Sequence, residues 1–433
     1  MSRRPHCLLL AFHFPPGRGS GVYRIRAWTN YLVCNGWDVT VVTVDPIFYS
    51  DITGAADHAL LESVDERVRL AYFRFPHEYL KQDVRKMSKL HAMLGPAYLK
   101  FWQSLPQKFF PEIYGHALPL MVARGLRAAV RHPVDLVLAT GNPYAQLGAA
   151  NVLASMLRIP YVVDFHDAWT LNQFTERDAF DRSHPAWAWE RRIIEGAALT
   201  VTVNEPLADW YRGEYPRVAD RIRVVENGWD PSTLTDPGPA QQVPLRPLRF
   251  GYVGTIRGDL PLEEFLAGWR IARSFPELSG ATFNFYGYLG FFSWNSKGIA
   301  SRLENPDDAV SYKGPVSQVD LASTYAELDV LAMLTPSSKY VTAGKVYDYM
   351  ASGRVVLGVH DPRNHSTDAF DGYDGFIPVA VVEPNAIAGG LRAAAVAARA
   401  TTAESHSQRR EASFAHTWDA AIARVAEELR GIL

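Results

Sequence analysis

The sequence predicts an α/β protein with two doubly wound parallel sheets. Short β-branched apolar runs alternate with longer helical patterns along both halves of the chain, as expected of successive βαβ units. A proline-rich stretch without hydrophobic periodicity, Asp230–Pro247, separates the halves and is typical of a linker. A chain of 433 residues is long enough for two domains that each bury a core.

The apolar runs give the expected strands in chain order. In the first half they are Cys7–Phe12, Asp38–Val44, Leu136–Ala139, Tyr161–Asp164, Leu199–Asn204 and Ile222–Glu226. In the second half they are Leu248–Gly254, Ala281–Tyr286, Val310–Tyr312, Val330–Met333 and Val355–Val359. The first run is shorter than the roughly 7–15 apolar residues of a secretory signal, so we expect a buried strand there.

The predicted first domain covers residues 1–231, and the predicted second domain covers residues 232–409. The last segment, Glu404–Leu433, is helical in pattern because its apolar residues recur at spacings of three or four. Ligands of open α/β sheets bind beyond the carboxyl ends of the strands. We therefore expect the two parallel sheets to face each other across a cleft that holds the ligand.

Composition and charge narrow the class of protein. Hydrophobic residues make up 48% of the chain and charged residues 21%, which is ordinary for a globular protein. The formal charge of −2 gives no reason to expect nucleic acid as a partner. Two cysteines provide neither a disulfide framework nor metal spacing, and no run approaches the roughly 20 apolar residues of a membrane span. These features favour a reducing, cytoplasmic location.

A basic and aromatic insertion is predicted within residues 73–115. Its core, residues 73–110, contains seven basic residues against two acidic ones, interleaved with aromatic side chains; the basic residues are Arg74, Lys81, Arg85, Lys86, Lys89, Lys100 and Lys108. Such a segment can hold a protein at the anionic inner face of a membrane, or bind a lipid-diphosphate acceptor. The alternative is a helical excursion with core aromatics and solvated lysines. Both interpretations stay open.

The stretch TAGKVYDYMASG, Thr342–Gly353, carries the most specific chemistry in the chain. Gly344 and Lys345 precede a short helical pattern, and a helix start with a lysine can hold a diphosphate. Asp348 lies three residues after Lys345, hence on the same helix face, where its carboxylate can accept hydrogen bonds from vicinal hydroxyls such as those of a ribose. The stretch predicts a site for a nucleoside diphosphate.

This stretch resembles the donor-binding signature of retaining glycosyltransferases of family 4. Four further segments resemble the family in the same order along the chain: Ala11–Arg26, Val162–Thr170, Val225–Pro231 and Phe250–Arg257. The resemblance implies the GT-B fold, in which two Rossmann-like domains with parallel sheets face each other across a cleft. It also implies that the C-terminal helix, residues 410–433, packs back on the first domain.

The resemblance assigns roles in the second domain. It implies catalytic roles for Arg257 and Lys345, which would neutralise the departing diphosphate without a metal ion, and donor binding by Gly254, Thr255, Gly344, Tyr347 and Asp348. Two positions depart from the family pattern. Leu262 stands where the family has a second lysine, and Tyr340 stands where it has the first acid of a pair, so the donor sugar is left open.

The resemblance also assigns roles in the first domain. Gly19, Ser20 and Gly21 form a loop after the first strand that lacks the full dinucleotide spacing, since position 24 is Arg. The loop is similar to the family's acceptor-side glycine loop near the diphosphate. His166 follows the strand Tyr161–Asp164, and the family pattern implies that it touches the transferred sugar, without acting as a general base.

Taken with the motifs, the resemblance implies a retaining, metal-independent glycosyltransferase. It would move a sugar from a nucleoside-diphosphate sugar to a hydroxyl of a small-molecule, lipid-linked or glycan acceptor, with no cofactor. A nucleotide-sugar 2-epimerase of the same fold is one alternative, although it requires acid and base carboxylates in the cleft. A non-catalytic subunit that binds a nucleotide sugar or a glycan is the other, and Leu262 and Tyr340 keep it open.

Overall fold

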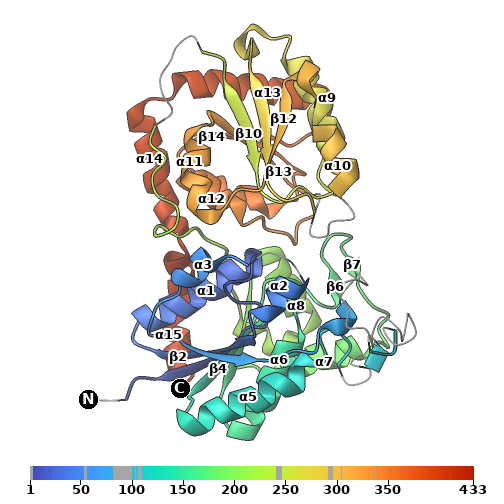
Figure 1. The fold of residues 1–433 in the computed structure, drawn as a ribbon, viewed down its shortest axis with the longest axis vertical. Helices are drawn as coiled ribbons and strands as arrows, with labels where there is room; N and C mark the ends of the chain where they lie inside the picture. Colours follow the sequence, from blue (N-terminus) through green and yellow to red (C-terminus); the bar gives the residue numbers. More distant parts are fainter. Residues whose placement is uncertain are drawn as a thin grey trace. The chain divides into compact units, whose positions relative to one another are not determined.

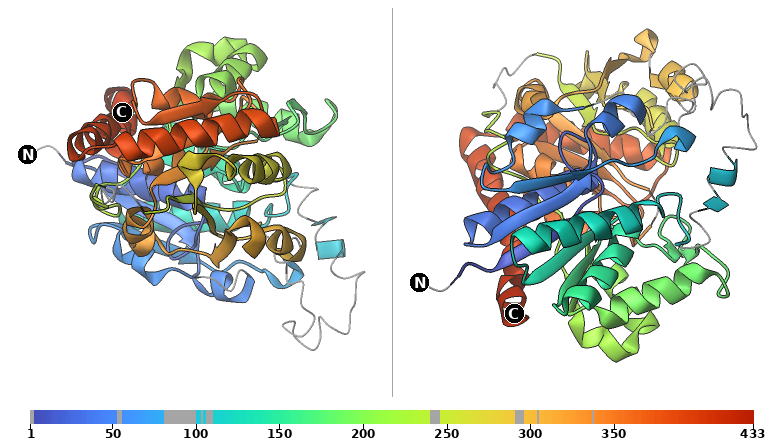
Figure 2. Two further views of the ribbon diagram at one scale, coloured as in Figure 1. Left: turned by 90° about the horizontal axis from the view of Figure 1, so that it is seen from above. Right: turned by 60° about the horizontal axis from the view of Figure 1, so that its bottom comes forward.

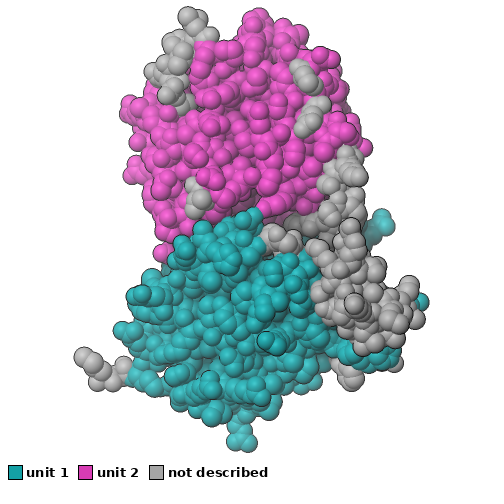
Figure 3. Space-filling model, viewed as in Figure 1, with its two compact units in different colours: residues 1–226, 421–433 teal, residues 227–420 magenta. Residues whose placement is uncertain are grey.

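The computed structural model describes residues 3–52, 56–80, 100–102, 104–105, 110–239, 246–290, 296–303, 305–336 and 338–433. The chain divides into two compact units, which Figure 3 colours separately. Unit 1 is Met1–Glu226 with Ala421–Leu433, and unit 2 is Asn227–Ala420. The division falls shortly before the predicted boundary at residues 231 and 232 and returns the end of the chain to unit 1.

Unit 1 is built on a seven-stranded sheet in the order β3-β2-β1-β4-β5-β8-β9, and every neighbouring pair is parallel. The strands are β1 His6–Leu10, β2 Asp38–Val44, β3 Arg69–Phe73, β4 Leu136–Gly141, β5 Tyr161–Phe165, β8 Leu199–Thr202 and β9 Ile222–Val224. The central strands β1, β4 and β5 are buried along their whole length, because helices cover both faces of a parallel sheet.

Helices connect the strands of unit 1 and cover its sheet (Figure 1). They are α1 Ser20–Cys34, α2 Ile47–Ile52, α3 His58–Glu62, α5 Ala117–Arg131, α6 Ala145–Leu157, α7 Pro185–Gly196 and α8 Glu205–Glu214. Helices α5 and α6 lie side by side against the sheet (Figure 2). Helix α1 contacts β2 and β4 and begins directly after the loop that follows β1.

Unit 2 has a six-stranded parallel sheet in the order β12-β11-β10-β13-β14-β15. Its strands are β10 Arg249–Val253, β11 Thr282–Tyr286, β12 Val310–Gly314, β13 Val330–Leu334, β14 Val355–Val359 and β15 Phe376–Val379. Its helices are α9 Leu262–Ala272, α10 Ser296–Leu303, α11 Leu321–Ala326, α12 Lys345–Ala351, α13 Pro384–Ala400 and α14 Ala403–Ser413. Helices α9 and α13 pack against each other in the core of the unit.

The predicted fold class is confirmed, because each unit has a parallel sheet with Rossmann-like alternation of strands and helices. Two strands were missed, β3 and β15, and both lie at sheet edges. The prediction relied on continuous apolar runs, which are typical of buried central strands. β3 is only partly buried, and β15 contains Pro378, a residue tolerated at an edge. The small hairpin of β6 Leu171–Asn172 and β7 Arg177–Asp178 was also missed.

The expected helix over Glu404–Leu433 is interrupted. Helix α14 ends at Ser413, a 3₁₀ turn η9 covers Phe414–His416, and α15 covers Trp418–Gly431. Trp229 accounts for the interruption: its N–H donates to the His416 carbonyl at 3.2 Å, and its carbonyl accepts from Trp418 N at 3.1 Å. Within unit 1, Glu428 of α15 forms an ion pair with Arg223 at 2.8 Å.

Much of the predicted insertion lies outside the described residues, including residues 81–99, 103 and 106–109. Lys81, Arg85, Lys86, Lys89 and Lys108 therefore have no structural description. Two aromatic residues of the insertion that the structure does describe, Tyr79 and Phe110, are buried in unit 1. In the described part of the chain, no helix is both long and apolar enough to cross a membrane.

Candidate functional site

The end of β10 and the start of α12 lie together in unit 2. Gly254 follows β10 with φ of 148°, a conformation that side chains disfavour, and Lys345 is the first residue of α12. A Cβ atom on Gly254 would stand 2.9 Å from Lys345 Nζ and 3.1 Å from its Cε. A glycine at 254 therefore leaves the space that the lysine side chain occupies. The segments that contain Gly254 and Lys345, which the sequence connected only through their motifs, are therefore adjacent in unit 2.

The aromatic residues of α12 hold that helix against β10. The Tyr349 hydroxyl accepts a hydrogen bond from Val253 N at 2.8 Å and donates one to the Val253 carbonyl at 3.0 Å. Tyr347 is only 1% exposed and packs in a core cluster with Trp229. Asp348, between the two tyrosines, is more exposed than either. The triplet thus combines two packing residues with one polar residue, and donor binding by Tyr347 stays a prediction.

The surroundings of Lys345 are unusual for a lysine. Its Nζ donates a hydrogen bond to the Tyr252 hydroxyl and lies 4.0 Å from the centroid of that ring. Removal from water is the main cause that lowers the pKa of Lys345 to about 7, and the nearby charge of Arg257 acts in the same direction. A group with this pKa is only partly charged at neutral pH, and a bound anion would favour its charged form.

Arg257 lies in the loop that follows β10, and it has a partner that the sequence did not suggest. Its Nε donates to Asp259 Oδ1 at 2.9 Å, and a quarter of the arginine side chain is exposed. Leu262 is the first residue of α9 and is buried in the core, so the family's second lysine has no counterpart at this position. The charge of Arg257 acts on Lys345, so these two predicted cations lie near each other at the end of β10.

The loop before α12 is fixed by residues that follow β14. Asn364 Nδ2 donates to the Ser338 carbonyl at 2.8 Å, and Ser366 Oγ accepts from Ala343 N at 3.0 Å. Tyr340, which stands where the family has an acid, is buried in this loop. Gly344 caps α12 with helical dihedral angles and needs no special conformation.

In unit 1, the glycine loop lies against His166. Gly19 caps α1 with φ of 143°. Ser20 and Gly21 were predicted to lie in the loop, but they are the first residues of that helix. A Cβ atom on Gly21 would stand 2.9 Å from His166 Nε2. The two elements were predicted from separate motifs, and the contact explains why glycine stands at position 21.

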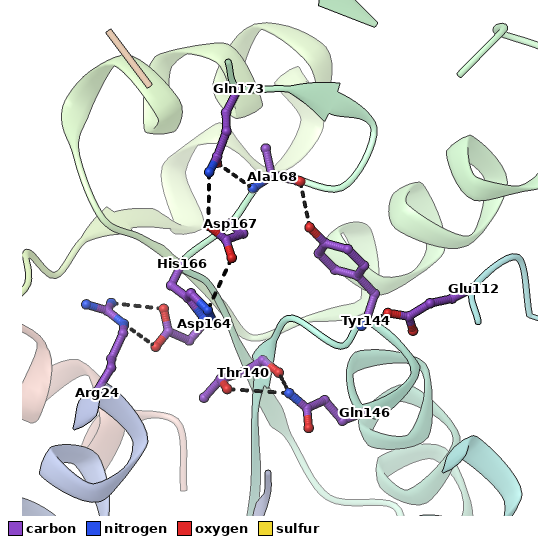
Figure 4. A network of polar contacts seen from close by, with 10 residues as sticks. All are labelled: Arg24, Glu112, Thr140, Tyr144, Gln146, Asp164, His166, Asp167, Ala168 and Gln173. Atoms are coloured by element: carbon purple, nitrogen blue, oxygen red, sulfur yellow. Dashed lines mark hydrogen bonds and ion pairs between the residues drawn. The ribbon is translucent and has the colours of Figure 1, made fainter. Parts of the chain in front are cut away.

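His166 is held by the loop that follows β5 (Figure 4). Its side chain is 11% exposed, and its Nε2 lies 3.5 Å from Asp167 Oδ2. Gln173 positions this carboxylate by donating from Nε2 to Asp167 Oδ1 at 3.0 Å. The second ring nitrogen of His166, Nδ1, is buried without a hydrogen-bond partner among the described residues. Close by, burial lowers the pKa of His13 to about 4, so that ring is neutral at pH 7.

A buried ion pair lies next to His166, and the sequence did not place it. Arg24 of α1 donates from Nε to Asp164 Oδ2 at 2.7 Å and from its terminal nitrogen to Oδ1 at 2.9 Å (Figure 4). Trp28 Nε1 donates to the same carboxylate at 3.0 Å. Both charged side chains are at most 1% exposed. An aspartate inside the apolar run of β5 was the available signal, since a buried carboxylate needs a partner.

Metal-ligand groups and cavities are the other kinds of site that the described residues could form. No group of three or more histidine, cysteine, aspartate or glutamate side chains within the described ranges is placed to hold a metal ion. A hollow of about 290 Å³ lies beside β15 and is lined by His360, Asp368 and Phe376 among others. None of the predicted site residues lines this hollow. The clusters at Lys345 and at His166 therefore stay the candidate sites.

One family model matches the chain, over the part that contains the His166 cluster. Residues 19–228 match the model of the family described as glycosyl transferase 4-like domain. By sequence, no curated protein matches the chain.

Several solved structures match nearly the whole chain. Sucrose-phosphate synthase from Thermosynechococcus elongatus is 16% identical, with a TM-score of 0.64 over 99% of each chain. Anabaena HepE in complex with UDP is 14% identical, with a TM-score of 0.61 over 99% of this chain and 100% of the other. A glycosyltransferase from Rickettsia africae is 11% identical, with a TM-score of 0.63 over 100% and 99% of the two chains. At these identities the likeness is one of fold.

Proposed function

We propose that this chain, which belongs with the GT-B glycosyltransferases through its glycosyl transferase 4-like domain at residues 19–228, is a retaining, metal-independent sugar transferase. Its donor is a nucleoside-diphosphate sugar, and its acceptor presents a hydroxyl group. The observation that carries the proposal is the convergence of Gly254, Arg257 and Lys345 at the carboxyl end of β10.

The donor diphosphate is assigned to unit 2. Lys345 and Arg257 supply positive charge at the end of β10, where the absence of a side chain on Gly254 makes room for the Lys345 ammonium. Charge develops on the diphosphate as it leaves, and positioned cations stabilise such charge best where water is excluded. Anabaena HepE binds UDP and UDP-glucose in its solved complexes, which supports UDP as the first nucleotide to test here.

The proposed transfer replaces one bond at the anomeric carbon of the donor sugar with another. The bond between the anomeric carbon and the diphosphate oxygen breaks, and a bond from that carbon to the acceptor oxygen forms with the configuration retained. The departing phosphate takes the proton of the acceptor hydroxyl, so no side chain need act as general base. In this scheme His166 contacts the sugar, and the start of α1, with Gly19 as its cap and Ser20 and Gly21 in its first turn, lies on the acceptor side, with Gly21 against His166.

A release assay tests the proposal. The purified protein is incubated with each of several nucleoside-diphosphate sugars, UDP-glucose among them, with and without an extract that contains candidate acceptors. Release of nucleoside diphosphate that requires the extract, with product of the donor's anomeric configuration, is the expected result. Conversion of the donor sugar without acceptor would favour an epimerase instead. Donor binding with no release in any extract would favour the non-catalytic subunit.

The variant Gly21→Ala tests the His166 cluster separately from the Lys345 cluster. Alanine at this position places its Cβ within 2.9 Å of His166 Nε2 and displaces the ring. Because small misplacements of site groups are costly, we expect transfer to fall about 10- to 100-fold. Affinity for UDP, measured by calorimetry, is expected to stay within about twofold, since the donor residues lie in unit 2.

Gly213→Ala is the matched control for this substitution. Gly213 lies in helix α8 of the same unit, and an added Cβ there meets no atom within 4 Å. The control is expected to retain full transfer activity. Wild-type transfer by Gly21→Ala would contradict the role given to the contact between the glycine loop and His166.

A further inference from the structure

A tyrosine hydroxyl lies at the centre of the Lys345 cluster without a role in the transfer scheme. Tyr252 is the fourth of the five residues of β10, and its side chain is fully buried. Its hydroxyl accepts a hydrogen bond from Lys345 Nζ and donates one to the Thr255 carbonyl at 2.8 Å. The same ring lies under the ammonium, 4.0 Å from Nζ to the ring centroid.

The partner of the hydroxyl is itself fixed. On one side of Thr255, Gly254 N donates to the Tyr286 carbonyl at 2.8 Å, and on the other side Ile256 N donates to the Tyr288 carbonyl at 2.8 Å. The Thr255 carbonyl therefore lies in a loop that backbone hydrogen bonds hold on both sides. Because the single hydroxyl proton of Tyr252 points to this carbonyl, the lone pairs of its oxygen are left for Lys345.

This arrangement favours the charged form of the lysine. A hydroxyl that can only accept towards Nζ stabilises an ammonium more than a neutral amine. Burial raises the pKa of Tyr252 above its ordinary value, so the hydroxyl keeps its proton. The other charged groups that act on Lys345 are Arg257 and Asp259 in the loop after β10, which oppose each other in sign. Asp348 follows three residues later in the first turn of α12.

We propose that Tyr252 is the positioning residue of the donor site, holding the Lys345 ammonium over Gly254 where the diphosphate of the nucleotide binds. The inference rests on the proposed function for its ligand, but the contact between the two side chains stands on the fold of unit 2 alone. Tyr252 acts through Lys345 and does not itself touch the reacting atoms.

The first test titrates Lys345 directly, without any nucleotide. Competitive acetylation of the full chain across pH 5 to 10, followed by mass spectrometry of the Lys345 peptide, gives the pKa of this amine. In wild-type protein it is expected near 7. Loss of an acceptor in Tyr252→Phe destabilises the ammonium, so the pKa is expected to fall by at least about half a pH unit.

Tyr373→Phe is the matched control for this titration. The Tyr373 hydroxyl also donates to a backbone carbonyl, that of Arg354 at 2.7 Å, and Tyr373 is buried in the same unit. This variant is expected to leave the pKa of Lys345 unchanged. An unchanged value in Tyr252→Phe as well would overturn the proposal, whether or not the protein binds a nucleotide.

The second test measures UDP affinity against pH. Below its pKa in the free protein Lys345 is already charged, and above that pKa binding must take up a proton, so affinity declines as pH rises. In Tyr252→Phe the decline is expected to begin at lower pH, with affinity at pH 7 reduced about 3- to 10-fold. A loss by one constant factor at every pH would indicate packing alone and overturn the positioning role. Absence of UDP binding by wild-type protein, with an altered Lys345 pKa in Tyr252→Phe, would instead contradict the proposed donor site and support the contact.

Discussion

Lys345→Ala is expected to weaken the binding of UDP about 10- to 100-fold while the protein stays folded. The substitution removes the ammonium that lies against Gly254, and a hydrogen bond to a charged group contributes about 1.5–3 kcal/mol. Each 1.4 kcal/mol corresponds to a tenfold change in affinity. Calorimetric titration with UDP measures the loss, and the thermal unfolding midpoint checks the fold.

Lys313→Ala is the control for the loss of one positive charge. Lys313 is an exposed lysine of β12 in the same unit. If binding depended only on the net charge of unit 2, the two variants would lose affinity equally. We expect Lys313→Ala to bind UDP within about twofold of wild type. Equal binding by wild type and Lys345→Ala would remove Lys345 from the donor site.

Asp164→Ala is expected to lower the free energy of unfolding of unit 1 by about 3–5 kcal/mol. The carboxylate accepts two hydrogen bonds from Arg24 and one from Trp28, all of them buried. Without it, the guanidinium of Arg24 stays in the interior with its charge uncompensated. Urea denaturation followed by circular dichroism measures the change.

Two further variants separate this effect from a general loss of polarity. Asp167→Ala removes a carboxylate three residues further on, which is 38% exposed, and is expected to cost less than about 1 kcal/mol. The double variant Arg24→Met with Asp164→Leu replaces the pair by apolar groups and is expected to recover most of the lost stability. A loss below about 1 kcal/mol in Asp164→Ala would contradict the importance of the buried pair.

The sequence predicted the fold where one physical signal dominates. Buried central strands such as β1 and β14 are continuous apolar runs, and both were found within one or two residues of their observed ends. The edge strands β3 and β15 are only partly buried, and neither is rich in β-branched residues: β3 reads RLAYF, and β15 reads FIPV and contains a proline. The break between α14 and α15 was missed because it depends on backbone hydrogen bonds from Trp229, a residue far away in the sequence.

The same contrast holds for the candidate site: residues within sequence motifs were predicted, and the residues that support them were not. Lys345, Gly254 and His166 lie in motifs, and the structure brings Lys345 to Gly254 and His166 to Gly21. Their supporting residues were missed because the contacts are distant in sequence, 93 residues apart for Lys345 and Tyr252 and 140 for Arg24 and Asp164. No local sequence pattern predicts a partner at such a distance along the chain. Tyr347 shares a motif with Asp348, yet packing of α12 against the core buries it.

The most direct test of the donor site is calorimetric titration of the full chain with UDP, GDP, ADP, CMP and dTDP. We expect tight binding of one nucleoside diphosphate, lost in Lys345→Ala and in Asp348→Ala, since both side chains lie on the first turn of α12. Such a result would also identify the base that carries the donor sugar. Binding of none of them, or binding that survives both substitutions, would contradict the claim that unit 2 holds a nucleoside diphosphate at the end of β10.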